Sequence, residues 1–440
     1  ITNHSYLFGL IHRGMREELL KTFDEIYVLN LHGNSNIGET PPDGGVDKNV
    51  FDIKQGVAIV LMVKTSTAAE LATVHYADLW GERENKYRVL NDNDIRTLDW
   101  EVLDSAAPHY FFVPKDFSLM DEYEVGWSAP DVFPINSTGV ETGRDAHLTS
   151  FDRAEVKMVA ESIADSSITN DDLEEIYSIR DTSGWPVSRR REKILEEGFQ
   201  TNQIVPIRYR PFDRRYVYFS SFLRRAHEST MRHMLRPNFA FSTTRQVTDL
   251  PFNHILASKY VTEYKMVSTD RNCYLFPLYL YPDEDAATLF DDTATSPWDP
   301  DPDHGNRVPN LSKAFVDDIE EKLGLPFDAH KVAAGQGAAF GPRDVLAYAY
   351  AIFHSPTYRE RYAEFLKIDF PRVPLTSDVD LFWRLVDLGD ELIQLHLMEH
   401  PKLHDTFTSF PVTGDNRVKP RGGFPKFVGE GESRTKTSDV

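Results

Sequence analysis

The sequence predicts an α/β protein in which a first sheet is followed by a mixed α/β region and a helical C-terminal part. Three observations lead to this class. Strand-length apolar runs alternate with a helix-spaced segment in residues 1–64, short aromatic strands separated by turn residues follow in 106–340, and two long helical patterns occupy 341–412. Apolar residues spaced three and four apart indicate helices, and short apolar runs between turn residues indicate strands.

The first 64 residues contain four predicted elements. Ile1–Leu7 is expected to be a short strand, and Arg13–Phe23 has its apolar residues at helical spacing. Ile26–Leu31 is an apolar strand. Gly56–Val63 is a continuous apolar run, which is typical of a strand buried on both faces. The polar Gly- and Pro-containing stretch 35–48 is expected to be a loop.

Residues 65–105 have a mixed polar composition, and we expect a connecting segment there, so that 1–105 form the first domain with its connector. The second domain is expected to span 106–340. Its predicted elements are an aromatic strand at Pro108–Pro114, a turn-rich loop at Asp131–Asp145, a helix at Ala154–Ala164, two strands around a turn at Ile204–Phe219, and an aromatic strand at Tyr274–Tyr281.

An acidic insertion is expected at 282–304, because this stretch holds eight acidic residues, four prolines and no Lys or Arg. Beyond it, Pro342 stands where a first-turn proline begins a helix. That helix and a second one at Leu381–Met398 make a predicted helical subdomain, 341–412. The residues 413–440 lack a clear pattern and are expected to form a poorly ordered tail.

The chain of 440 residues is acidic, with 48 Lys and Arg against 69 Asp and Glu and a net charge of −21. Residues 180–245 are an exception, since they hold 14 basic and 6 acidic residues, a local net charge of +8. A basic stretch of this kind is compatible with a DNA-binding groove. The single Cys273 excludes an internal disulfide, and no apolar run is long enough to span a bilayer, so we expect a cytoplasmic protein.

Two segments, Tyr350–Leu375 and Tyr209–Tyr218, resemble the C-terminal target-recognition part of the Type ISP restriction–modification enzymes. Ile1–Leu7, Glu25–Asn34 and Asn49–Ile59 are similar to the trailing strands of the adenine-N6 DNA methyltransferase domain in that class. The resemblance implies that the trailing part of a methyltransferase-like sheet precedes a target-recognition domain. It also implies double-stranded DNA as the partner.

The catalytic loop of that class, Asn/Asp-Pro-Pro-Tyr/Phe, is absent from the sequence, because the one Pro-Pro pair, Pro41–Pro42, is followed by Asp43. The Gly-rich turn that holds S-adenosylmethionine is absent too. We expect both to lie upstream of Ile1 and this segment alone to be inactive. For the intact enzyme the resemblance implies S-adenosylmethionine as methyl donor, ATP and Mg²⁺ for a translocase and a nuclease, and these upstream domains as partners in the same polypeptide.

The resemblance also suggests single residues that contact DNA. Phe51 matches an aromatic residue that stacks on a flipped adenine, and the alternative is a core Phe at a strand edge. Thr142 and Arg144 lie in a loop with Gly139 and Gly143 and could donate to phosphates or base edges. The alternative for Arg144 is a surface ion pair with a neighbouring carboxylate.

The basic stretch supplies the other DNA-binding candidates, and most of them are expected to contact phosphates rather than bases. We expect them to form one continuous positive surface. They are Arg208, Arg210, Arg214, Arg215, Tyr216, Arg224, Arg225, Arg232 and Arg245.

Two alternatives remain open from the sequence. The chain could be a stand-alone DNA-binding specificity module without catalysis, or an unrelated acidic α/β protein without a DNA role. The His354-Ser355 pair ends a helix before Pro356 and implies no third orienting group, so we interpret His354 as structural. The acidic run 299–303 does not fit a calcium loop, and no metal site is expected.

Overall fold

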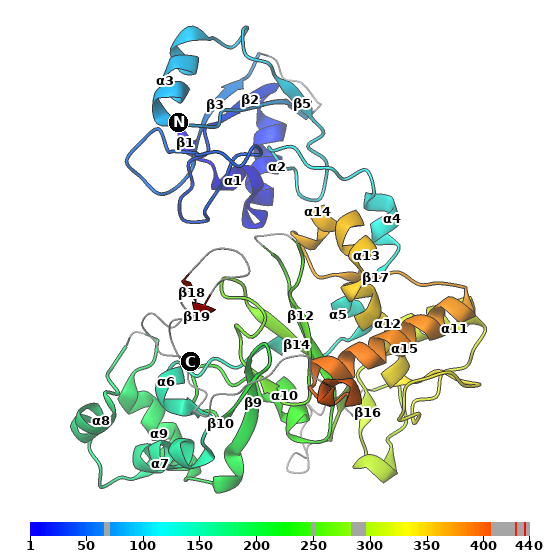
Figure 1. Ribbon diagram of the computed structural model, residues 1–440. Helices are drawn as coiled ribbons and strands as arrows, with labels where there is room; N and C mark the ends of the chain where they lie inside the picture. The colour runs from blue at the N-terminus through cyan, green and yellow to red at the C-terminus, as the bar shows by residue number, and fades with distance from the viewer. Residues whose placement is uncertain are drawn as a thin grey trace.

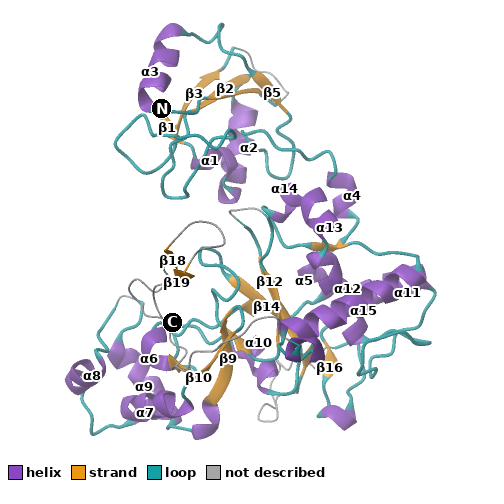
Figure 2. Cartoon of the chain, in the orientation of Figure 1, coloured by secondary structure: helices purple, strands orange, loops and turns teal. Residues whose placement is uncertain are grey.

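The computed structural model describes residues 1–65, 71–182, 184–247, 251–282 and 296–405, and the backbone of two short strands, β18 (Phe427–Val428) and β19 (Thr435–Lys436). Most of the predicted acidic insertion and the remainder of the predicted tail lie outside these residues. Figure 1 shows the blue N-terminal part next to a larger body, and Figure 2 shows strands and helices mixed in both. The predicted α/β class is confirmed.

The N-terminal part is a five-stranded sheet with the order β1-β3-β2-β4-β5. Strands β2 and β4 are parallel, and the other neighbours are antiparallel. The strands are β1 (Thr2–Asn3), β2 (Glu25–Asn30), β3 (Val57–Val63), β4 (Thr73–Asp78) and β5 (Glu101–Leu103), and the helices are α1 (Ser5–Phe8), α2 (Arg13–Thr22) and α3 (Arg83–Asp92). The predicted helix at 13–23 and strand at 26–31 are therefore confirmed.

The strand predicted at Ile1–Leu7 is wrong beyond its third residue. The Asn3 side chain accepts a hydrogen bond from the Ser5 amide at 2.8 Å, and the chain turns there into α1. This local bond offers the backbone an alternative to the sheet.

The prediction that β3 is buried on both faces is also wrong for its second half. Val57 and Ala58 are buried, but Leu61 is 50% and Val63 is 37% exposed. The short neighbour β1 pairs only with these first two residues of β3. The rest of β3 therefore lies at the edge of the sheet.

The predicted connecting segment at 65–105 instead contains β4, α3 and β5. Strand β4 buries Val74 and Tyr76 and alternates them with more exposed residues. Helix α3 buries Lys86 rather than an apolar residue. Because the buried position of α3 is a lysine and not an apolar residue, the spacing of apolar residues did not indicate this helix.

The larger body contains two four-stranded sheets, ordered β13-β9-β10-β8 and β12-β11-β14-β7. The first consists of β8 (Thr149–Ser150), β9 (Ile204–Arg210), β10 (Asp213–Tyr218) and β13 (Val261–Thr262), and α7 (Arg153–Ala164), α8 (Asn170–Tyr177) and α9 (Val187–Glu197) share its hydrophobic cluster. The second consists of β7 (Ser137–Thr138), β11 (Ala240–Thr244), β12 (Ile255–Ser258) and β14 (Cys273–Pro277). The predicted strand pair at 204–219 and helix at 154–164 are confirmed.

Short elements connect these layers. The aromatic strand predicted at Pro108–Pro114 is wrong, because Tyr110 has a φ of 51° and its amide bonds back to Ala106, so the chain turns. The remaining short elements are α4 (Met120–Glu124), β6 (Trp127–Ser128), α5 (Ala129–Val132), α6 (Asp145–Leu148), α10 (Glu228–Met231), β15 (Tyr279–Leu280), β16 (Val308–Pro309), α13 (Pro356–Arg361), α14 (Ala363–Leu366), β17 (Arg372–Val373), and the 3₁₀ helices Leu10–His12, Thr201–Gln203, Arg232–Leu235, Pro302–His304 and Pro401–His404.

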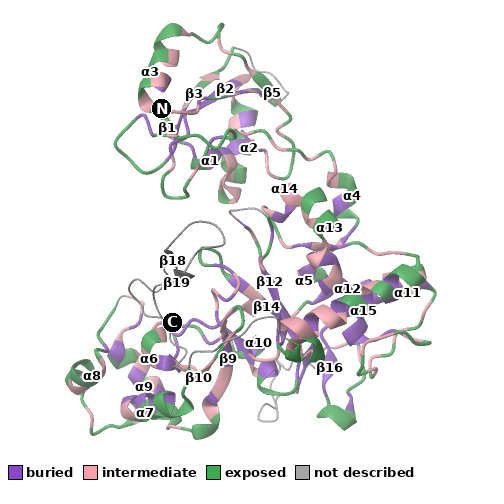
Figure 3. Ribbon diagram, viewed as in Figure 1, coloured by how far each residue is buried: buried purple, intermediate pink, exposed green. Residues whose placement is uncertain are grey.

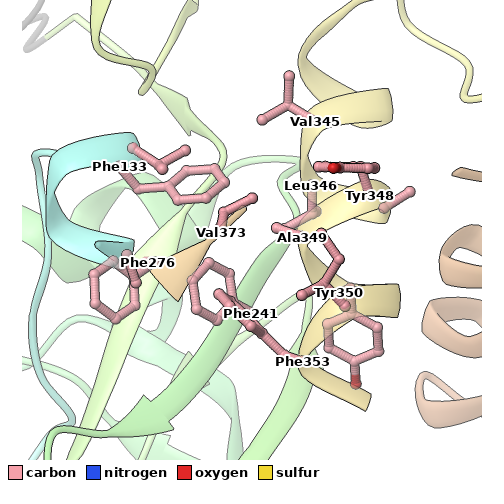
Figure 4. Packing of buried hydrophobic residues seen from close by; sticks show 14 of the residues in the cluster. Phe133, Phe241, Phe276, Val345, Leu346, Tyr348, Ala349, Tyr350, Phe353 and Val373 are labelled. Carbon is pink, nitrogen blue, oxygen red and sulfur yellow. The ribbon is translucent and has the colours of Figure 1, made fainter. Parts of the chain in front are cut away.

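The largest hydrophobic cluster joins the second sheet to α11 (Lys313–Leu323), α12 (Pro342–His354) and α15 (Val379–His396). In Figure 4, Phe241 and Phe276 of the sheet face Phe353 and other residues of α12. The rings of Phe241 and Phe276 stack with centroids 4.8 Å apart. The two predicted C-terminal helices are therefore confirmed, and they share a core with the strands before them.

Cys273 begins β14 and is completely buried. Burial raises the pKa of its thiol to about 12. Figure 3 shows buried residues concentrated in the central strands and α12, whereas the outer helix α8 is mostly exposed. Within the described ranges, no helix is both long and apolar enough to cross a membrane.

Candidate nucleic-acid interface

Phe51 lies on the surface, in the loop that precedes β3. Its side chain is 42% exposed, which excludes the alternative of a core Phe. The guanidinium of Arg83 in α3 donates to the carbonyls of Asn49 at 2.8 Å and Phe51 at 2.9 Å. This loop is therefore held by its backbone, and the ring is left available for a planar partner.

A polar cluster lies at the carboxyl ends of β2 and β4. His32 shares hydrogen bonds with Glu39 at 2.8 Å and Asp78 at 2.6 Å, and its ring stacks on Trp80. Burial alone would lower the pKa of His32, but the hydrogen bonds and charges of Asp78 and Glu39 raise it above its ordinary value. Each ring nitrogen of His32 therefore has a carboxylate that can accept its proton, which favours the imidazolium form.

His4, His32 and Glu39 bring one potential ligand atom each to within 4.8 Å of one another. A metal ion needs a ring nitrogen without a proton. His32 uses both nitrogens for carboxylates, and His4 bonds Asn30 through Nδ1 at 3.1 Å. We therefore interpret the cluster as a hydrogen-bonded support for the loops after β2 and β4.

The charged state of His32 predicts a pH dependence of stability. Because its folded pKa lies above the unfolded value of about 6.5, the stabilisation is complete below that pH and is lost as the pH rises through the folded pKa. We expect the urea midpoint of unfolding to fall as the pH rises above about 6.5, and His32→Gln to flatten this dependence. His404 is exposed, and His404→Gln should leave the pH dependence of the urea midpoint as in the wild type. An unchanged pH profile in His32→Gln would contradict the assignment.

The loop of Thr142 and Arg144 is packed against protein. Thr142 is fully buried and its hydroxyl donates to Asp145, so its DNA contact stays a prediction that this conformation does not favour. Arg144 donates to the Arg180 carbonyl and lies over the Trp185 ring at 5.3 Å, instead of pairing with a neighbouring carboxylate. A Cβ on Gly143 would lie 2.6 Å from Trp185, so this glycine allows close packing.

The hairpin of β9 and β10 carries a network of paired charges. Arg210 pairs with the buried Glu263, and Arg215 pairs with Asp213 at 2.9 Å. The guanidinium groups of both arginines lie over the Tyr209 ring, at 4.1 and 3.9 Å. Burial raises the pKa of Glu263 to about 7, although Arg210 opposes the shift.

Three further exposed arginines pair with carboxylates, of which Glu141 is buried and Asp369 is exposed. Arg224 and Arg225 both contact Glu141, at 2.5 and 3.5 Å, and Arg245 contacts Asp369 at 2.8 Å. Together with Arg210 and Arg215, five of the candidates therefore have an acidic partner. The prediction of one continuous positive surface is wrong for these five, because acidic residues distant in the sequence fold onto them.

The remaining candidates differ in exposure. Arg214 of β10 lies opposite Arg208 of the neighbouring strand β9. Its side chain is exposed and donates to the Tyr260 hydroxyl at 3.2 Å. Arg208 is only 3% exposed and lies inside the protein. Arg232 donates to the Tyr281 carbonyl at 2.9 Å, and Tyr216 packs against the cluster of the first sheet.

Comparisons with known proteins agree on one class. The family described as Type ISP C-terminal specificity domain matches residues 131–435. A search of curated proteins gave no match. A solved structure described as ATP-dependent Type ISP restriction-modification enzyme LlaBIII bound to DNA is 22% identical to this chain, with a TM-score of 0.64. The match covers 90% of this chain and 25% of the chain in that structure.

Two further solved structures have the same fold. The DrdV–DNA complex gives a TM-score of 0.63 at 22% identity, covering 90% of this chain and 37% of that chain. A nuclease-deletion mutant of the Type ISP enzyme LlaGI with a DNA substrate mimic gives 0.60 at 21% identity, covering 90% and 34%. The chain thus spans about a quarter to a third or slightly more of these structures.

Proposed function

Because the chain belongs to the Type ISP C-terminal specificity domain family, we propose that it recognises a target sequence in double-stranded DNA for a restriction–modification enzyme. The family match over residues 131–435 carries this proposal. The three similar structures, each described as a complex with DNA or a DNA substrate mimic, support it.

The surface ion pairs are compatible with this function. Arg245 and Asp369 are 55% and 54% exposed, and exposed pairs contribute only about 0–1 kcal/mol. Arg225 is 61% exposed and lies 3.5 Å from the buried Glu141, which keeps Arg224 as its nearer partner at 2.5 Å. A DNA phosphate can therefore replace the carboxylate of Arg245 or Arg225 at little cost. The exposed Arg214 has no acidic partner among the described residues and needs no exchange. We propose that Arg214, Arg225 and Arg245 contact the DNA backbone.

The paired arginines of the hairpin have a different proposed role. Arg210 and Arg215 are held by carboxylates and by the Tyr209 ring, so they set the shape of the hairpin rather than exchange partners. Burial raises the pKa of Glu263, and the charge of Arg210 opposes this shift. The pair joins the hairpin to the residues that follow β13.

For the N-terminal sheet we propose the trailing part of an adenine-N6 methyltransferase domain, with Phe51 as the ring that stacks on the flipped base. The exposure of Phe51 and its backbone-held loop support this role. The sequence has neither the Asn-Pro-Pro-Tyr loop nor the Gly-rich turn, so its residues do not by themselves fit S-adenosylmethionine. We therefore derive no methyl transfer from this chain. ATP and Mg²⁺ would serve motor and nuclease domains, which we propose as partners in the same polypeptide.

Salt dependence of duplex binding tests the proposed function. We expect fluorescence anisotropy to show binding whose affinity falls steeply with salt, because each neutralised phosphate contributes a slope of about −0.9 in log K against log salt. Arg225→Gln and Arg245→Gln should each reduce the steepness of the slope by about 1. Arg384→Gln, on the exposed face of α15, is the control with the same loss of charge.

The outcome separates the proposal from its main rival. The net charge of −21 favours an acidic protein without a DNA role. Absence of binding at low salt, or binding that does not respond to salt, would support that rival and reject DNA recognition.

A further inference from the structure

A pocket of about 250 Å³ lies between the tip of the β9–β10 hairpin, the start of β12, and the C-terminal ends of α12 and α15. Its lining includes Phe212, Asn253, His354, Arg359 and His396. Figure 1 shows these elements meeting in the middle of the larger body. None of the lining residues that the structure describes is acidic.

Hydrogen bonds determine which nitrogen of His354 carries the proton. Arg359 Nη2 lies 2.9 Å from His354 Nδ1, and a guanidinium can only donate, so Nδ1 accepts. The proton is therefore on Nε2, which is buried and has no hydrogen-bond partner. Burial, followed by the charge of Arg359, lowers the pKa of His354 to about 3, so this ring is neutral. His354 thus offers an N–H donor without an acceptor.

His396 is arranged in the same way. The Tyr350 hydroxyl accepts from the Ala257 amide at 3.0 Å and lies 2.5 Å from His396 Nδ1. The hydroxyl proton has this nitrogen as its acceptor, which leaves the ring proton on Nε2. Burial and the charges of Arg359 and Arg208 lower the pKa of His396. A second neutral imidazole therefore presents a donor in the same pocket.

The charge around the pocket is positive, and no carboxylate among the described residues bonds to Arg359. Arg359 is held by the Phe353 carbonyl at 2.7 Å, by Asn253 and by His354. The guanidinium of Arg208 acts electrostatically on both Tyr350 and His396. Its Nε is buried without a partner. Arg208 also feels the negative charge of Asp213, but the Asp213 carboxylate already accepts a hydrogen bond from Arg215.

Buried polar groups are normally hydrogen-bonded, and buried charges are normally paired. His354 brings an unpartnered buried donor to the lining, beside a second imidazole and Arg359. Arg208, which does not line the pocket, adds its charge from behind it. Together these groups point to a missing anion. We propose that this pocket binds a phosphate group and, resting on the proposed function, that the phosphate belongs to the DNA backbone. Phe212, 54% exposed at the hairpin tip, and the exposed Arg214 opposite Arg208 lie where a strand could approach. A free phosphoryl group is the other source of the same chemistry.

Inorganic phosphate is the first probe. We expect it to raise the melting temperature of the full chain in a saturable way at constant ionic strength, because a ligand that binds only the folded state stabilises it. Chloride at equal ionic strength should give no saturable rise. The absence of a saturable response to phosphate in the wild type would overturn the inference without any variant.

Two variants locate the effect. Arg208→Met removes the unpaired charge, and we expect it to melt at or above the wild-type temperature without phosphate and to lose the phosphate-dependent rise. His354→Asn keeps an acceptor for Arg359 but removes the Nε2 donor, and should weaken phosphate binding about tenfold, the scale of a lost hydrogen bond to a charged group. Arg384→Gln is the control for loss of charge. If both pocket variants kept the full phosphate-dependent rise in melting temperature, the assignment of the phosphate site to this pocket would be wrong.

DNA binding by the same variants distinguishes the two sources. Weaker duplex binding by Arg208→Met than by Arg384→Gln, with competition by phosphate, assigns the pocket to the DNA backbone. Unchanged DNA binding with a lost phosphate response assigns it to a free phosphoryl group and rejects the DNA assignment. If the wild type responds to phosphate but binds no DNA at low salt, the proposed function fails and the anion site stands.

Discussion

Gly389→Ala is expected to destabilise the chain by about 3 kcal/mol, near the upper end of the range for overpacking a core. Gly389 is buried in α15 where this helix crosses α12. A Cβ at this position would lie 2.6 Å from the carbonyl carbon and 3.1 Å from the Cα of Ala347. Because these are backbone atoms, a side-chain rotation cannot relieve the clash, and the two helices must separate. Urea unfolding followed by circular dichroism measures the loss.

Gly14→Ala is the matched control. Gly14 lies in α2, and a Cβ there would have no heavy atom within 4 Å. Alanine is favoured over glycine in a helix by about 1 kcal/mol, so this substitution should leave stability unchanged or raise it. If Gly389→Ala unfolds at the same urea concentration as Gly14→Ala, the close contact of α12 and α15 is not present in solution.

Lys86→Met is expected to destabilise the N-terminal sheet by about 3–5 kcal/mol, the cost of leaving one buried ion without its partner. Lys86 Nζ lies 2.6 Å from Asp47, and both side chains are 0% exposed. The same ammonium donates to the Leu31 carbonyl at 2.7 Å and to the Lys48 carbonyl at 2.8 Å. It therefore joins α3 to the loops that follow β2 and precede β3. Urea titration with tryptophan fluorescence measures the effect.

A surface lysine in the same region separates burial from loss of charge. Lys48 pairs with Glu82 at 3.2 Å, and the two side chains are 59% and 50% exposed. Lys48→Met should cost no more than about 1 kcal/mol, as exposed pairs do. Equal effects of the two substitutions would show that Lys86 is not buried in solution.

The sequence was sufficient where apolar residues determine the element. Helices α12 and α15 and the β9–β10 hairpin follow from periodic apolar residues and turn residues, and all three are present. It failed in α3, where the buried position is Lys86, and at residues 108–114, where aromatic side chains pack from a turning backbone. The order of residue types along the chain cannot distinguish a charged side chain that is buried with a partner from a charged side chain that is exposed.

The candidate interface was harder to predict, because its electrostatics depend on contacts between distant segments. Glu141 and Arg224 are 83 positions apart, and Arg245 and Asp369 are 124 apart. Neither pair can be inferred from local spacing. Arg208 and Arg214 are close in the sequence, yet one is buried and the other is exposed. The basic composition of the stretch was evident, but the structure determines which arginines remain accessible.

The burial of Cys273 has a practical consequence for labelling this chain. Thiol reagents attack the thiolate, and with a pKa of about 12 inside β14 this sulfur is protected from them. Because Cys273 is the one cysteine of the sequence, a cysteine engineered at an exposed position would be the sole site for a dye. The native chain therefore serves directly as a background for single-molecule fluorescence.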